Sequence, residues 1–201
     1  MPVDRARGTG RVLAWTFDDG PNPGPTDAVL DLLGEHGVRA VFCVVGDQVR
    51  APGGVALLRR TVTEGHVLAN HGTSFADLGA WPAHRVRADL AENLRIIRSA
   101  LGDERAPVPF FRAANGSWGC SPAVAVELGM QPLGIGPVIG DWETQDPGVL
   151  TERLRAAVRP GAVLLVHDGP GYRWGTVRAV RAVLPGLLAD GWACTLPAVR
   201  G

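Results

Sequence analysis

Short apolar runs of strand length alternate along the sequence with longer segments in which apolar residues recur at helical spacing. The clearest runs cover 12–17, 40–45 and 162–166, and the clearest helical stripe covers 83–101, with Gly102 beyond it. This alternation is typical of β-α-β units, whose strands lie parallel in one sheet or barrel. A chain of 201 residues has the length of one domain, so we expect a single α/β domain over 1–201.

The remaining elements are predicted from the same periodicity and from Gly and Pro. Further strands are expected at 67–70, 109–112 and 192–196, with one or two weak strands in the Gly/Pro-broken stretch 131–140. Further helices are expected at 55–63, 122–128 and 150–158. Thr26 is expected to cap a helix that Gly37 stops, and Pro185 to bend or stop a helix over 176–189.

Composition excludes several partners. Twenty basic residues balance twenty acidic ones and no basic run occurs, so the chain lacks the positive field that nucleic acid or an anionic membrane requires. No apolar run approaches a membrane span, and the first residues contain no apolar signal core, so a cytoplasmic location is expected. Cys43, Cys120 and Cys194 are scattered, which is untypical of a disulfide framework or a zinc cluster. A small molecule is therefore the expected partner, and the oligomeric state stays open.

Reactive side chains stand where the predicted strands end. They are Asp18 and Asp19, His71, Arg112, Asp141 and Trp142, and His167 and Asp168. In a parallel α/β barrel the carboxyl ends of the strands meet on one face, so these side chains are expected to share an active site.

Each part of this set also has a structural interpretation. Two adjacent carboxylates are stable only beside a cation or with a proton, which favours one on a metal and one acting as a base. Asp18 and Asp19 could instead form an Asp-Gly-Pro turn in which one carboxylate caps the backbone. His167 suits a general acid beside a carboxylate, but it could equally be a core histidine with satisfied hydrogen bonds.

Five ordered segments together resemble a known family. They are Thr16–Pro21 with Asn22-Pro23-Gly24, the run Gly65–His71, Phe111-Arg112, Asp141-Trp142, and Leu165–Asp168. They are similar to the motifs of the polysaccharide deacetylases, the NodB-homology group of carbohydrate esterase family 4. The resemblance implies a distorted parallel (β/α)7–8 barrel that hydrolyses acetyl groups on sugars with one divalent metal, usually zinc.

The resemblance also implies roles for the polar residues. Asp18 would be the general base that takes a proton from the attacking water, and Arg112 would orient it. His167 would be the general acid that protonates the leaving amine, and Asp141 would pair with His167 and raise its pKa.

The metal-binding motif departs from the family pattern. Asp19 and His71 would be metal ligands, but the position of the family's second histidine holds Phe75. Catalytic zinc typically has three protein ligands and a water, so two ligands predict a weak, substrate-completed or absent metal site. Zinc therefore remains the expected cofactor only if another group supplies the third ligand.

The substrate groove also differs from the pattern. Trp142 and Leu165 would line the acetyl pocket, and the backbone N–H of Asn115 would serve as an oxyanion donor. The family usually continues its arginine with two prolines and an aromatic residue, whereas this chain continues with Ala113, Ala114 and Asn115. An altered, small substrate is expected, such as an acylated amino sugar, a natural-product intermediate or a cyclic amide.

The sequence thus predicts a hydrolase of an N-acyl or other non-peptide C–N amide bond. Two alternatives remain open. The first is a metal-independent enzyme that runs a cyclisation, elimination or isomerisation on the same scaffold. The second is a catalytically silent homologue that only binds a ligand.

Overall fold

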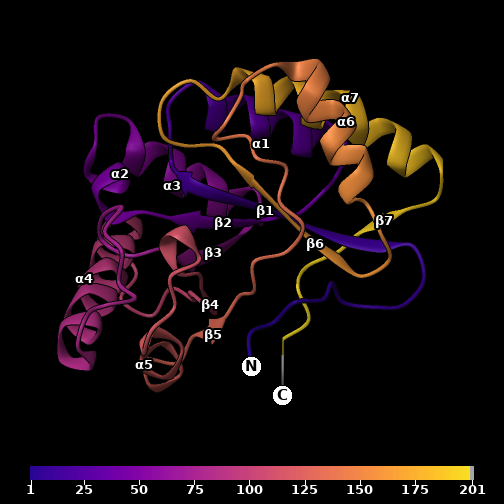
Figure 1. Cartoon of the computed structure of the whole chain (residues 1–201). Coiled ribbons are helices and arrows are strands. Elements are labelled where there is room, and N and C mark those ends of the chain that lie inside the picture. Colours follow the sequence, from indigo (N-terminus) through magenta and orange to yellow (C-terminus); the bar gives the residue numbers. More distant parts are fainter. Residues whose placement is uncertain (200–201) are drawn as a thin grey trace.

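The computed structural model describes residues 1–199 and contains one curled parallel sheet with helices on its outside (Figure 1). The strands follow the order β5-β4-β3-β2-β1-β6, and β7 pairs with the beginning of β1. Their bounds are β1 Val12–Gly20, β2 Val41–Val44, β3 Val67–Asn70, β4 Phe110–Phe111, β5 Gln131–Pro132, β6 Ala162–His167 and β7 Ala193–Cys194. The α/β fold with a distorted parallel barrel is confirmed.

The helices connect successive strands and cover the outer face of the sheet (Figure 1). Their bounds are α1 Pro25–Glu35, α2 Gly46–Arg50, α3 Gly54–Thr63, α4 Ala83–Leu101, a 3-10 turn Ala114–Gly116, α5 Ser121–Glu127, α6 Pro147–Ala157 and α7 Trp174–Ala189. No helix within residues 1–199 has both the length and the apolar character needed to cross a membrane.

Side-chain alternation along the strands produces two separate apolar clusters. Trp15 and Phe17 of β1 belong to the large cluster that the helices cover, whereas Ala14 belongs to a smaller one. The smaller cluster is made of strand residues and of three residues in isolated bridges, and it fills the inside of the curled sheet. Its members are Val3, Ala6, Val12, Ala14, Val41, Cys43, Ala69, Phe110, Leu133 and Val163. Every second side chain of a strand points to the same face of the sheet, so the side chains that point into the barrel form an inward row along each strand. Each inward row can be followed to the carboxyl edge of the sheet.

Four predicted site residues continue these inward rows. Asp18 follows Ala14 at an even spacing on β1, and His71 follows Ala69 beyond β3. Arg112 likewise follows Phe110, and His167 follows Val163 on β6. The alternation that fills the inside of the barrel therefore also directs these four side chains to its mouth.

An irregular segment closes the barrel between β5 and β6. Leu133 forms a parallel bridge with Val3, and Val138 forms one with Leu165 of β6. The N–H of Leu165 donates to the carbonyl of Pro137 at 3.1 Å. The weak strands expected in 131–140 are thus the short β5 and two isolated bridges, which makes the barrel distorted on this side.

One expectation about a helix was wrong, and of another only one alternative is excluded. Thr26 does not cap α1: it lies inside the helix, and its Oγ1 is 2.5 Å from Oδ2 of Asp168. The N-terminal turn is made instead by Gly24, whose φ is 91° and whose N–H donates to the carboxylate of Asp27 at 2.9 Å.

Pro185 does not stop α7, which continues to Ala189. A proline removes one backbone hydrogen bond of the helix. Val183, Leu184 and Leu187 are buried on both sides of it, and this packing against the sheet holds the helix together. The five-residue helix α2 was not predicted, because it is too short to show a periodicity.

Candidate active site

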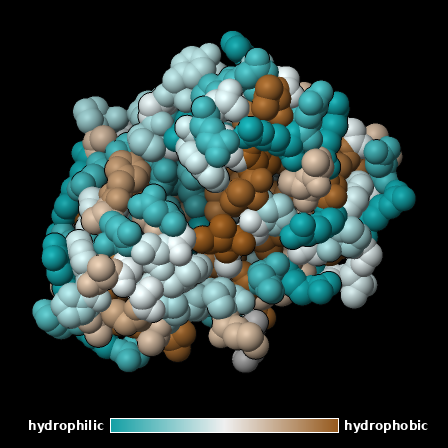
Figure 2. Space-filling view, in the orientation of Figure 1, coloured by the Kyte–Doolittle hydropathy of each residue, from teal (hydrophilic) through white to brown (hydrophobic). Residues whose placement is uncertain are grey.

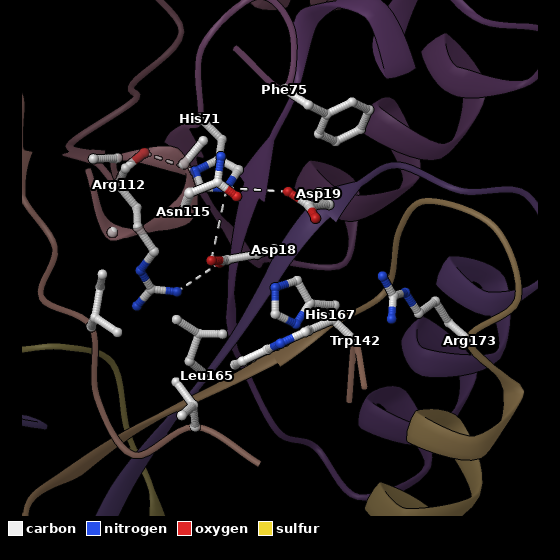
Figure 3. A pocket seen from close by; sticks show the side chains of 15 residues that line it. Asp18, Asp19, His71, Phe75, Arg112, Asn115, Trp142, Leu165, His167 and Arg173 are labelled. Atoms are coloured by element: carbon white, nitrogen blue, oxygen red, sulfur yellow. Dashed lines mark hydrogen bonds and ion pairs between the residues drawn. The ribbon is translucent and has the colours of Figure 1, made fainter. Parts of the chain in front are cut away.

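A cavity of about 540 Å³ opens at the carboxyl end of the barrel (Figure 3). The predicted site residues that line it are Asp18, Asp19, His71, Phe75, Arg112, Asn115, Trp142, Leu165 and His167. Asp141 does not line the cavity, because its side chain is fully buried behind His167. The structure thus brings together most of the residues that the sequence placed at strand ends. Asp168 is the exception, because its side chain is buried against Thr26 of α1, and Arg173 is among the lining residues that were not predicted.

Asp18 is fixed by a buried arginine. Nη1 of Arg112 donates to Oδ1 of Asp18 at 2.6 Å and to Oγ1 of Thr16 at 2.7 Å, and Nη2 donates to the carbonyl of Gly134 at 3.0 Å. Burial on its own would raise the pKa of Asp18, but Arg112, followed by His71 and His167, holds it below its ordinary value. Asp18 is therefore an ionised, oriented carboxylate at neutral pH.

Asp19 reaches the same cavity through an irregular backbone. Strict alternation would turn its side chain to the outer face of β1, but the register of β1 against β2 shifts between Asp18 and Gly20, and Asp19 has a φ of 73°. A non-glycine residue in this region is strained, and such strain concentrates at functional sites. The shift places Oδ1 of Asp19 3.2 Å from Nε2 of His71 (Figure 3).

His71 is oriented by a backbone carbonyl. Its Nδ1 lies 2.7 Å from the carbonyl oxygen of Arg112, which can only accept, so Nδ1 carries a proton. Nε2 consequently faces the carboxylates, 3.2 Å from Asp19 and 3.9 Å from Asp18. Burial lowers the pKa of His71, but these two carboxylates outweigh burial and raise it above its ordinary value.

The donor set does not complete a three-ligand metal site. Asp19 and His71 supply two suitable donors, whereas Phe75, on the cavity wall and 41% exposed, supplies none. Within residues 1–199, no group of three or more His, Cys, Asp or Glu side chains is arranged to hold a metal. Because catalytic zinc takes three protein ligands, these residues alone do not fit the family's metal.

His167 forms a close pair with Asp141. Its Nδ1 lies 2.7 Å from Oδ1 of Asp141 and its backbone N–H donates to Oδ2 at 2.8 Å, so Nδ1 carries a proton and Nε2 is the remaining ring nitrogen. Burial lowers the pKa of His167, but Asp141, and then Asp18 and Asp19, raise it above its ordinary value. His167 can therefore hold a proton near neutral pH.

Two residues that the sequence analysis did not single out support this pair. Oγ1 of Thr176 donates to Oδ2 of Asp141 at 2.9 Å. Gln145 connects the same region to α7, because its Nε2 donates to the Asp141 carbonyl at 2.6 Å and its Oε1 accepts from the N–H groups of Gly175 and Thr176. Thr176 has no local sequence signal, since it is 35 residues from Asp141, and the contacts of Gln145 with α7 span about 30 residues although Asp141 is only four residues away from it.

The rest of the cavity wall is largely apolar. The ring of Trp142 meets that of His167 edge-on, with centroids 5.5 Å apart, and Leu165 lies on the same strand as His167. Asn115, in the turn after β4, has a φ of 56°. Ile135 and Val138, which the sequence analysis passed over in its least readable segment, also line the cavity.

An oriented carboxylate and a histidine that can hold a proton at the mouth of a parallel barrel are the two groups that acid–base catalysis requires. The family model of the polysaccharide deacetylases matches residues 5–133, and the chain belongs to this family. It is an enzyme of the deacetylase type, an amidohydrolase of C–N bonds, as the sequence predicted.

Known relatives and structures agree with this assignment. The chain is 32% identical to a chitooligosaccharide deacetylase of Rhizobium leguminosarum bv. trifolii over 96% of this chain and 93% of that protein. A family 4 acetyl xylan esterase from Clostridium thermocellum, solved with a cobalt ion, has a TM-score of 0.81 at 28% identity, over 92% of this chain and 87% of that one. A pseudoenzyme of the CE4 family from Bacillus anthracis shares the fold, with a TM-score of 0.85 at 20% identity over 98% of this chain and 67% of that one.

Proposed function

We propose that this chain hydrolyses the N-acyl amide of a small acylated amino sugar or a similar small amide, with Asp18 as base and His167 as acid. One observation carries the proposal. Asp18 and His167 are paired in register on the neighbouring strands β1 and β6, and both line the cavity. A base and an acid on adjacent inward rows can act on the two ends of the same scissile bond.

Asp18 starts the reaction by taking a proton from a water molecule in the cavity. The water oxygen then forms a bond to the acyl carbon, and the carbonyl becomes a tetrahedral oxyanion. Arg112 holds Asp18 ionised and fixes its direction with a 2.6 Å hydrogen bond. The buried Arg112 thus stabilises the form of Asp18 that can act as a base.

His167 completes the reaction at the leaving nitrogen. Nδ1 is occupied by Asp141 at 2.7 Å, so Nε2 is the atom that delivers the proton. As the proton reaches the amide nitrogen, the C–N bond breaks, and a carboxylate and a free amine leave. The raised pKa of His167 keeps this proton available near neutral pH.

The backbone of Asn115 supports the oxyanion. A backbone N–H donates whatever its side chain is, so the change from an aromatic residue leaves this donor intact. The left-handed conformation of Asn115 sets the direction of the peptide at the cavity wall.

The substrate class rests on size and on the relatives. A cavity of about 540 Å³ has room for a ligand of small-molecule size. The curated relative cited above is named for chitooligosaccharides, which are N-acetylated amino sugars. The cytoplasmic location expected from the sequence belongs to the same proposal. Zinc as the cofactor remains a prediction from the family resemblance.

The test measures release of free amine from N-acetylglucosamine and its short oligomers by the purified chain. We expect turnover in the unmodified chain and a loss of at least 100-fold in Asp18→Asn and in His167→Ala, the lower bound of general acid–base catalysis. Asp190→Asn, an exposed carboxylate at the end of α7, is the matched control and should retain activity. Full activity in Asp18→Asn would refute the assigned base.

A further inference from the structure

The catalytic cavity is lined by several exposed apolar side chains besides the catalytic residues. Ile135, Val138 and Trp142 line the cavity and are 42%, 43% and 53% exposed. Figure 2 shows hydrophobic side chains gathered in the hollowed middle of this face, with hydrophilic side chains around them. Single exposed apolar residues need no explanation, but several that adjoin one another in a cavity indicate a ligand with apolar surface.

This apolar surface adjoins the catalytic residues directly. Leu165 and His167 are two residues apart on β6, so both side chains point to the same face of the strand. Val138 is bridged to Leu165, which puts it on the next row of the same wall. In Figure 3, Leu165 and Arg173 lie on opposite sides of His167, so the apolar wall occupies one half of the cavity and the arginine the other.

The facing wall is built from small residues. Ala113, Ala114 and Gly116 line the cavity on the turn after β4. Ile135 reaches this turn, since a Cβ on Gly116 would lie 2.8 Å from Cδ1 of Ile135. The turn therefore lies against Ile135, and Ala113, Ala114 and Gly116 add no long side chain to this part of the cavity.

We propose, on the basis of the function proposed above, that the preferred substrate carries an unbranched or branched apolar acyl group of at least four carbons. The carbonyl carbon lies between Asp18 and His167, and the acyl chain extends along Leu165, Val138 and Ile135. The amine half occupies the other side of His167. Burial of each further methylene on this wall raises kcat/KM by about fourfold.

The experiment compares glucosamine carrying N-acetyl, N-butyryl and N-hexanoyl groups, with release of glucosamine as the common readout. Butyryl adds two methylenes to acetyl, so we expect kcat/KM to rise about 15-fold when both are buried. Val138→Ser and Ile135→Ser should reduce the butyryl-to-acetyl ratio several-fold. Val149→Ser, a valine of similar exposure on α6 that does not line the cavity, should leave the ratio unchanged.

Two results would overturn the proposal without affecting the proposed function. One is faster hydrolysis of the acetyl compound than of both longer ones, and the other is an unchanged ratio in both serine variants. If none of the three compounds is hydrolysed, the proposed function fails instead. The acyl preference is then tested by calorimetric binding of the same compounds. Tighter binding of the hexanoyl than of the acetyl compound to the unmodified chain, with the difference lost in Val138→Ser, supports the proposal. Equal binding of the two compounds refutes it.

Discussion

Replacing Asp141 by asparagine should shift the pH at which activity is lost. In the folded chain His167 donates from Nδ1 to Asp141 at 2.7 Å, and this carboxylate helps to raise the pKa of His167. A hydrogen bond to a charged group contributes about 1.5–3 kcal/mol, and one pKa unit corresponds to about 1.36 kcal/mol. Asp141→Asn should therefore lower the pKa of His167, because an asparagine oxygen accepts the Nδ1 hydrogen bond without carrying a negative charge.

The direction of the effect follows from the role of His167 as an acid. Activity requires its protonated form, so kcat/KM falls as pH rises through its pKa, and this fall should begin at a lower pH in Asp141→Asn. The variant also loses stability, because an amide cannot accept all three hydrogen bonds that Asp141 receives from the N–H and Nδ1 of His167 and from Thr176. An unsatisfied donor costs about 1–3 kcal/mol, so unfolding must be measured alongside.

The assay is a pH profile of amine release between pH 5 and 9, restricted to the range in which both proteins are folded. Glu143→Gln, an exposed carboxylate two residues away, is the control and should leave the profile unchanged. An alkaline limb that stays in place in Asp141→Asn would refute the coupling between Asp141 and the catalytic proton.

Three further predictions concern the metal position, the backbone and a buried acid. Phe75→His should raise the affinity for zinc or cobalt at least tenfold, because it supplies a third donor; a competition titration measures it, and Phe75→Leu should change nothing. Gly20→Ala should lower the free energy of unfolding by more than about 1 kcal/mol, since its Cβ would clash with the carboxylate of Asp168. Gly34→Ala in α1, where a Cβ meets nothing, should raise the free energy of unfolding by about 0.5–1 kcal/mol. Urea unfolding measures both changes. Burial raises the pKa of Asp168 to about 7, so as pH rises this carboxyl ionises in the unfolded chain before it does in the folded one. The free energy of unfolding should therefore fall between about pH 4 and 7, by up to about 1.4 kcal/mol per pH unit. Urea unfolding across this range should show a smaller decline in Asp168→Asn.

The fold was predictable where the sequence pattern is local. The expected bounds 67–70 and 83–101 agree with β3 and α4, because strand boundaries and a helical apolar stripe with a following glycine are read directly from neighbouring residues. Thr26 was misjudged because its partner, Asp168, is 142 residues away. Whether Pro185 stops α7 could not be decided locally, because burial of α7 in the large apolar cluster outweighs the lost hydrogen bond.

The candidate site was predictable to a similar extent. Placement at strand ends, together with the two-residue alternation of strands, brings Asp18, His71, Arg112 and His167 to one mouth. The contacts of Thr176 with Asp141 and of Gln145 with Gly175 could not be anticipated, because they join segments that only the completed fold brings together.

The division of labour between Asp18 and His167 is tested most directly by comparing an amide with an activated aryl ester of the same acyl group. The ester's leaving group needs no proton, so His167→Ala should lose amide hydrolysis by at least about 100-fold and ester hydrolysis by less than about tenfold, whereas Asp18→Asn should lose both. Equal losses on the two substrates in His167→Ala would contradict its role as the acid that frees the amine.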